Sequence, residues 1–513
     1  MARAGPSGRP AAGPGAARTA RRGRVALPSV VAGGALALSL PPWGWWPLAF
    51  AGAALLAWRL GGLGLRARLL AGWLAGVGCY VPGLFWAREF NWYGAAVLMA
   101  IEALSMGAAA ALVPPGRGRL LAVPAAFTLV EAVRMRWPFG GLPIGGVFLG
   151  QAGGPLLGAA RLGGPLLLTA VVWLGGAALA EVAAGVRRAH PGPLAAGALA
   201  LVVVVAVGLA GALAPDGGAP VARLRVAAVQ GGGRHGVSDE AADRPSAFAA
   251  QVAATRRLER ADGPRLVLWP EDVIALQGPL AGSPEAAHMS AIARRLGATV
   301  VAGVTQPASP TTFDNMVVAW GPDGRIAGRF EKVHRVPFGE YVPYRSFFAH
   351  FATLSGVPLT AVPGHGSGLL RTPAAPLGVL VSYEVFYADR GRSSVRAGAE
   401  LLVVPTNASS YSATQVPTEE LAAARVQAVE EGRDLVQAAP TGLSAVVDHD
   451  GDVVLRSVLG RRQVLEATVA LRTGRTLYER FGDLPALVLS VLALLGGWAA
   501  GRRRAAGWRG GFR

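Results

Sequence analysis

The stretch EKVHRVPFGEYVP, residues 331–343, contains Lys332, which is the only lysine among the 49 basic side chains of the sequence. Arginine cannot replace lysine where a compact ammonium with rotatable donors is needed. Lys332 follows MVVAWGPDGRIAGRF (316–330), a pattern that predicts two strands around a turn. A solitary ammonium at the end of a strand is therefore a candidate for a functional role.

Strands and helices alternate on both sides of this stretch, from about residue 214 to 484. Short apolar runs predict buried strands at 221–230, 266–270, 298–306, 378–384 and 399–407. Helical patterns lie between or after them, at 245–261, 285–296 and 417–432, and SAVVDHDGDVV (444–454) predicts a second hairpin. The segment is long enough for its own core, and the alternation indicates an α/β domain.

Two further polar side chains end or interrupt these apolar strands. Glu271 follows LVLWP (266–270), and Ser382 lies inside GVLVSYEVF (378–386). Active sites of α/β domains gather at strand ends, although a strand end is also where a chain returns to solvent. Glu271, Lys332 and Ser382 are therefore candidate catalytic residues.

The composition of the rest of the chain indicates membrane helices. Apolar residues make up 52% of the sequence and charged residues only 16%, whereas soluble chains are roughly one quarter charged. A spanning helix needs ~20 mainly apolar residues. The apolar runs predict a membrane domain of seven helices over 25–213 and an eighth helix at 485–501. The runs are 25–41, 45–58, 69–87, 94–114, 119–133, 164–185, 193–213 and 485–501.

The distribution of arginine predicts the orientation of these helices. The net charge of +18 would suit a nucleic-acid-binding protein. However, with the N-terminus inside, 18 arginines and no acidic residue fall on the predicted inner segments. This excess follows the positive-inside rule and removes the main argument for a nucleic-acid partner. Residues 1–24 then form a disordered basic arm, 502–513 a cytoplasmic tail, and 221–470 an extracytoplasmic domain.

The sequence shows no sign of a disulfide or a metal centre. Cys79 is the single cysteine and lies in an apolar run, which excludes a disulfide within the chain and a cysteine zinc site. The seven histidines show no paired-ligand spacing on a helix. We therefore expect no metal.

Three blocks carry a family resemblance. WPED (269–272), EKVHRVPFGEYVP (331–343) and SYEVF (382–386) resemble the signature blocks of the nitrilase, or carbon-nitrogen hydrolase, superfamily. The second block and the flanking membrane helices resemble the apolipoprotein N-acyltransferases, over roughly residues 25 to 500. This resemblance implies an α-β-β-α sandwich for the soluble domain and a multi-pass monomeric enzyme of the bacterial plasma (inner) membrane, without a cofactor.

The resemblance also implies roles for individual residues. Glu271 takes the position of the general base, Lys332 that of the oxyanion donor, and Glu340 that of a second carboxylate nearby. Tyr383 and Glu384 match residues beside the nucleophile. The family moves a fatty acyl chain from a phospholipid to the N-terminal diacylglyceryl-cysteine amine of lipoproteins, so phospholipid and diacylglyceryl-modified apolipoproteins are the expected partners.

The sequence departs from the family at the nucleophile, where Ser382 stands in place of cysteine. A serine hydroxyl is a weak nucleophile until a base takes its proton. Ser382 would form an oxyester if Glu271 removes that proton. A serine–histidine pair with His334 is a less favoured alternative, because we expect His334 to face away from the site. An enzyme of this kind passes the acyl group either to an amine or, as a membrane-anchored hydrolase, to water. If no base acts on Ser382, the chain is an inactive, lipoprotein-binding homologue.

Reporter fusions test the predicted topology. A reporter at residue 300 and a reporter at residue 510 are expected to lie on opposite sides of the membrane, because the inner segments collect the arginines. An alkaline phosphatase reporter should be active only at residue 300, and a cytoplasmic fluorescent reporter only at residue 510. The same side for both positions would contradict the eight-helix topology.

Overall fold

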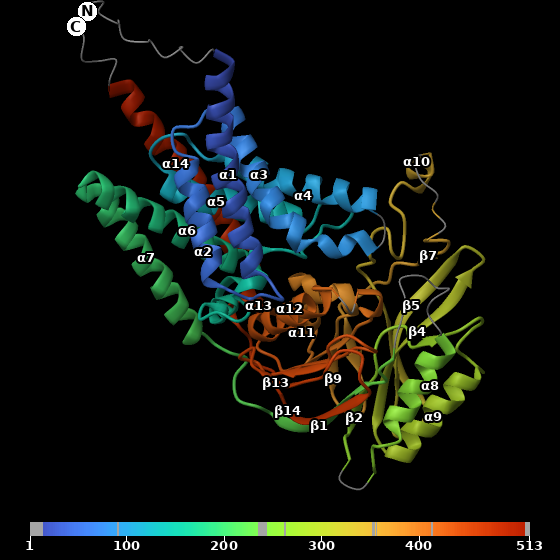
Figure 1. Ribbon diagram of the computed structural model, residues 1–513. Helices are drawn as coiled ribbons and strands as arrows, with labels where there is room; N and C mark the ends of the chain where they lie inside the picture. Colours follow the sequence, from blue (N-terminus) through green and yellow to red (C-terminus); the bar gives the residue numbers. More distant parts are fainter. Residues whose placement is uncertain are drawn as a thin grey trace, which may run out of the picture.

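The computed structural model describes residues 14–89, 92–233, 244–260, 263–350, 354, 356–411 and 414–507. Within these residues the chain forms a bundle of long helices and a domain with two β-sheets, which lie at opposite ends of the molecule in Figure 1. The membrane-helix and α/β fold class predicted from the sequence is confirmed.

The bundle is built from the apolar runs of the sequence. Four helices in the described part are long and apolar enough to cross a membrane, namely Trp92–Leu112, Leu157–Arg188, Pro191–Ala212 and Leu484–Arg502. Two shorter apolar helices are Ala26–Ser39 and Pro47–Arg59. The eight-span topology therefore stays a prediction. The helices of the bundle are α1 (Pro14–Ser39), α2 (Pro47–Arg59), α3 (Leu65–Gly83), α4 (Trp92–Leu112), α5 (Arg119–Arg134), α6 (Ala160–Arg188), α7 (Pro191–Ala212) and α14 (Leu484–Gly507).

Helices extend into both basic ends of the chain. Helix α1 begins at Pro14, inside the segment 1–24 for which the sequence predicts a disordered arm. Residues 14–24 are rich in Ala and Arg, which have high helix propensity and extend the first helix. Helix α14 likewise continues to Gly507, into the predicted tail. Residues 1–13 and 508–513 lie outside the described residues.

Small residues allow neighbouring helices of the bundle to approach closely. A Cβ atom added at Gly76 of α3 would lie 2.6 Å from the Cα atom of Ala103 in α4. Such contacts are typical of membrane helices, where close packing holds helices together. The outer surface exposes large apolar side chains, such as Leu199 of α7 and Leu489 of α14. Both features suit a bundle surrounded by lipid.

The α/β domain contains two sheets. The first has the strand order β14-β1-β2-β4-β5-β6, with β3 paired to β4 and β7 to β5, and the second has the order β13-β12-β11-β10-β9-β8. The first comprises β1 (Ala222–Gln230), β2 (Leu266–Leu268), β3 (Ile274–Ala275), β4 (Thr299–Ser309), β5 (Thr312–Trp320), β6 (Ile326–Glu331), β7 (Thr360–Ala361) and β14 (Gln463–Leu471). The second comprises β8 (Leu369–Arg371), β9 (Pro376–Val379), β10 (Leu401–Pro405), β11 (Leu435–Ala438), β12 (Ala445–Val447) and β13 (Val453–Arg456).

Helices cover the outer faces of both sheets. Helices α8 (Arg244–Thr255) and α9 (Pro284–Leu296) cover the first sheet, and α11 (Ala388–Arg396) and α12 (Val416–Glu431) cover the second. Apolar side chains of the two sheets pack against each other between these layers. The α-β-β-α arrangement agrees with the prediction. The short helices α10 (Arg345–Phe348) and α13 (Leu477–Phe481) lie in connections.

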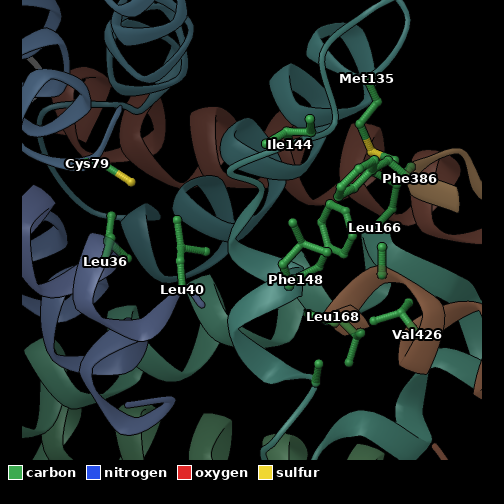
Figure 2. Packing of buried hydrophobic residues seen from close by; sticks show 14 of the residues in the cluster. Leu36, Leu40, Cys79, Met135, Ile144, Phe148, Leu166, Leu168, Phe386 and Val426 are labelled. Atoms are coloured by element: carbon green, nitrogen blue, oxygen red, sulfur yellow. The ribbon is translucent and has the colours of Figure 1, made fainter. Parts of the chain in front are cut away.

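Helices α11 and α12 also face the membrane bundle, as Figure 1 shows. Phe386 and Val426 of the α/β domain belong to the same buried apolar cluster as Phe148, Leu166 and Leu168 of the bundle, and Figure 2 shows these side chains together. Helix α12 of this layer is therefore buried on both sides, and the two domains share one core.

Candidate active site

The loops after β2 and β6 bring two of the predicted site residues together with Glu340. The Nζ atom of Lys332 donates to Oε1 of Glu271 at 2.9 Å and to Oε1 of Glu340 at 2.8 Å. Lys332 and Glu271 are buried, with 1% and 5% of their surfaces exposed. The backbone of β4 passes close to the backbone of Glu271 and fixes the position of this residue. A Cβ atom added at Gly303 of β4 would lie 2.4 Å from the Cα atom of Glu271.

Asn315 completes this cluster, although nothing in its local sequence distinguishes it. Its Nδ2 atom donates to Oε1 of Glu271 at 2.9 Å and to Oε1 of Glu340 at 3.0 Å. The second oxygen of Glu340 accepts the backbone N–H of Val336 at 2.8 Å. Glu340 therefore uses both oxygens to hold Lys332, Asn315 and its own loop, which indicates a positioning role.

The electrostatics of the cluster keep Lys332 charged. Burial acts to lower the pKa of Lys332, but the carboxylates of Glu271 and Glu340 outweigh it and raise this pKa above its ordinary value. Burial raises the pKa of Glu271, and the charge of Glu340 adds to this, while Lys332 opposes both. An ammonium has three donors, and the described residues accept from it at two carboxylates. One donor is left for a substrate oxygen.

Ser382 lies in a sharp turn after β9, where the sequence predicts a strand through residue 384. The strand ends at Val379, and a 3-10 turn covers Ser382–Phe386. The φ angle of Ser382 is +49°, in the left-handed region that serine seldom adopts. Nucleophiles are often presented on such strained turns, because the turn projects the hydroxyl from the end of the sheet.

The hydroxyl of Ser382 faces a carboxylate that the sequence patterns did not single out. Its Oγ atom donates to Oε1 of Glu420 in α12 at 3.5 Å and lies 3.1 Å from Oγ1 of Thr406, which directly follows β10. Oγ1 of Thr406 in turn donates to Oε1 of Glu420 at 2.7 Å. Within the described residues, Ser382 forms no hydrogen bond with Glu271 or Lys332.

Glu384 acts as a clamp between the turn and the loop that follows Lys332. Its carboxylate accepts the backbone N–H groups of Val333 at 2.9 Å, His334 at 3.0 Å and Val381 at 2.9 Å. The guanidinium of Arg390 lies 3.5 Å away. This fully buried carboxylate therefore holds the turn at Ser382 beside the loop that follows Lys332.

Exchange of Glu384 for glutamine is expected to destabilise the domain. One acceptor oxygen becomes an NH2 group, so at least one of the three backbone N–H groups loses its partner inside the protein. The free energy of unfolding should fall by about 2 kcal/mol, and the midpoint of thermal unfolding in detergent should fall with it. Glu466→Gln, at an exposed position of β14, is the control. Equal midpoints for the two variants would contradict the clamp.

Tyr383 connects the nucleophile turn to the membrane bundle. Its hydroxyl donates to the carbonyl of Gly141 at 3.0 Å, and the hydroxyl of Tyr387 donates to the same carbonyl at 2.9 Å. Gly141 lies in the connection between α5 and α6. The side chain beside the candidate nucleophile is therefore a contact between domains.

His334 does not pair with Ser382. Its ring stacks on Tyr387 with 4.1 Å between ring centroids, and its Nε2 atom lies 3.8 Å from Asp389. A serine–histidine pair is thus not formed among the described residues. The hydrogen bond that Ser382 Oγ donates goes to the carboxylate of Glu420 instead.

Two known families match the two parts of the chain, the helical bundle and the α/β domain. The apolipoprotein N-acyltransferase N-terminal domain matches residues 32–178, and the carbon-nitrogen hydrolase domain matches residues 225–478. The yeast Nit3 protein, a solved member of the nitrilase superfamily, aligns with a TM-score of 0.38 at 20% identity. That alignment covers 50% of this chain and 93% of Nit3.

Relatives match over most of the length. The apolipoprotein N-acyltransferase of Mycolicibacterium smegmatis is 32% identical over 506 residues, covering 91% of this chain and 84% of the relative. The enzyme of the same name from Rhodopseudomonas palustris is 29% identical and covers 92% and 94%. The resemblance found in the sequence is therefore confirmed. The chain, an acyltransferase of the nitrilase superfamily, belongs to the apolipoprotein N-acyltransferase family.

Proposed function

We propose that the protein moves a fatty acyl chain from a phospholipid to the N-terminal amine of diacylglyceryl-modified apolipoproteins, through an acyl-enzyme on Ser382. The observation that carries this proposal is the buried Glu271–Lys332–Glu340 cluster in the domain that holds Ser382 on a strained turn. Nucleophile, oxyanion donor and carboxylates are the parts that acyl transfer needs.

In the proposed reaction, Ser382 Oγ attacks the ester carbonyl of the phospholipid. The ammonium of Lys332 stabilises the tetrahedral oxyanion with its remaining donor. Glu271 is the general base, which takes the serine proton and gives it to the leaving alcohol, and then takes a proton from the incoming amine and returns it to Ser382 Oγ. The lysophospholipid leaves, and the lipoprotein amine then attacks the acyl group. Glu340 and Glu384 position Lys332 and the turn.

The position of the site suits two lipid substrates. Tyr383 contacts Gly141 of the bundle, and Phe386 packs in the core that the two domains share. An acyl chain that leaves the bilayer along the bundle would therefore meet the nucleophile turn directly. The proposal includes an extracytoplasmic site, a bacterial inner membrane and a monomeric enzyme without a cofactor.

Mass spectrometry of lipoprotein N-termini tests the function. A strain that lacks this protein should lose the third, amide-linked acyl chain from its lipoproteins, and the gene should restore that chain. With purified protein, bacterial phospholipids and a synthetic diacylglyceryl-cysteine peptide, the expected product is the N-acyl peptide. Release of free fatty acid at an equal rate with and without the peptide would indicate a hydrolase. No reaction would indicate a binding homologue.

A further inference from the structure

Glu420 is the carboxylate that accepts a hydrogen bond from the candidate nucleophile within the described residues. It lies on α12 with only 3% of its surface exposed. Its Oε1 atom meets Ser382 and Thr406. Its Oε2 atom is buried without a hydrogen-bond partner in the described part of the chain. Glu419, Glu430 and Glu431 of the same helix are also buried with unpaired oxygens, so the contact with Ser382 is what distinguishes Glu420.

We infer that Glu420 is a second catalytic carboxylate, which accepts the proton of Ser382 Oγ directly. The inference rests on the proposed role of Ser382 as nucleophile. It reassigns the serine proton, which the family resemblance would give to Glu271. The Oε1 atom of Glu271 already accepts from Lys332 and Asn315, and no hydrogen bond joins Glu271 to Ser382 within the described residues.

The hydroxyl of Thr406 holds the carboxylate of Glu420 in place. It donates to Oε1 of Glu420 at 2.7 Å, and its contact with Ser382 Oγ, at 3.1 Å, also has Thr406 as the donor. The serine proton therefore faces Glu420 through the direct contact of Ser382 Oγ with Oε1, at 3.5 Å. A cysteine would have less need of this arrangement, because a thiol ionises far more readily than a serine hydroxyl.

Glu420 then carries the proton through both half-reactions, while Glu271 stays a carboxylate beside Lys332. As the bond from Ser382 Oγ to the acyl carbon forms, the serine proton passes to Glu420 and the carbonyl electron pair moves to oxygen. The oxyanion collapses, the ester C–O bond breaks, and the leaving alcohol takes the proton from Glu420. In the second half, the attacking amine gives a proton to Glu420, and Ser382 Oγ leaves with that proton.

The charge state of Glu420 supports this assignment. Burial raises its pKa to about 7, with the charge of Glu271 adding to the effect and Thr406, Lys332 and Ser382 opposing it. A general base is most effective when its pKa lies near the working pH. Since protonated Glu420 cannot accept a proton, the rate should fall as the pH drops through about 7.

The test combines substitutions at both positions. Transfer is followed by mass spectrometry with bacterial phospholipid vesicles and a diacylglyceryl-cysteine peptide. Glu420→Gln should reduce the rate roughly a hundredfold or more in the natural serine protein, as expected for loss of a general base. In the Ser382→Cys protein, the same exchange should cost less than about tenfold, because the thiol supplies thiolate without a strong base. Equal losses in both backgrounds, or no loss in the serine protein, would overturn the inference.

Glu419→Gln is the matched control on the same helix. Glu419 is fully buried, neither of its oxygens has a hydrogen-bond partner among the described residues, and burial holds its pKa well above the ordinary value. Glutamine therefore imitates its neutral form, and wild-type activity is expected.

The pH profile provides a second readout that a structural role of Glu420 would not change. Glu420→Gln should lose the fall in rate near pH 7, and retention of that fall would contradict the inference even if Ser382→Cys proves inactive. Ser382→Ala separates the two hypotheses. Full activity in Ser382→Ala rejects the proposed function itself, whereas an inactive Ser382→Ala with an unimpaired Glu420→Gln rejects only the role of Glu420.

Discussion

Ser382→Ala is expected to abolish acyl transfer, because no acyl-enzyme can form without the hydroxyl. Ser382→Cys is expected to remain active, since a thiol is intrinsically the better nucleophile and differs from the hydroxyl by one larger atom. The measurement is N-acyl peptide formation in detergent or vesicles. Folding is checked by the midpoint of thermal unfolding, which neither exchange should lower strongly at a turn held by Glu384.

The same pair of variants separates an active serine enzyme from a relic. In a relic, Ser382→Ala changes nothing measurable, and Ser382→Cys creates activity from none. An acyl chain trapped on Ser382 should resist neutral hydroxylamine as an oxyester, whereas the chain trapped on Ser382→Cys should be released as a thioester. Unchanged transfer by an active protein carrying Ser382→Ala would exclude the covalent mechanism.

Lys332→Arg is expected to reduce activity by roughly a hundredfold or more. A guanidinium keeps the charge but is planar and longer, so it would displace the donor that faces the oxyanion. Oxyanion donors contribute about 3 kcal/mol in other enzymes. The ammonium also holds Glu271 and Glu340 at 2.9 and 2.8 Å, and a fork-shaped group cannot keep both contacts and the third donor in place.

The control for Lys332→Arg lies on the preceding strand. Arg329 of β6 points to solvent, with 66% of its side chain exposed, and Arg329→Lys makes the reverse exchange without touching the site. It should leave the rate unchanged. Wild-type activity in Lys332→Arg would mean that Lys332 does not take part in catalysis.

The predicted and missed parts of the site differ in their local sequence signal. Glu271 and Lys332 each follow an apolar strand, so they stand out by contrast with their neighbours. Asn315 and Thr406 carry no such contrast, because an amide or hydroxyl at a strand end is common. The turn at Ser382 was also missed, since GVLVSYEVF has a continuous β pattern and the positive φ angle depends on the tertiary clamp by Glu384.

The local sequence does not single out Glu420, for a different reason. The segment TEELAAARVQAVEE (418–431) has the acidic residues of a solvated helix, yet α12 buries Glu419, Glu420, Glu430 and Glu431. The helix lies between the second sheet and the membrane bundle, so both of its faces are covered. Periodicity within one segment cannot predict a second covering layer that comes from a distant part of the chain.

The raised pKa of Lys332 also limits where an activated acyl group can go. An unprotonated lysine attacks acyl esters, and a chain with many lysines would expose its own amines to the product of its first step. All the other Lys and Arg residues of this sequence are arginines. Their guanidinium groups stay protonated and do not accept an acyl group. Lys332 itself is locked as an ammonium between two carboxylates. If Ser382 forms the proposed acyl-enzyme, no lysine amine of the chain is available to take the acyl group from it.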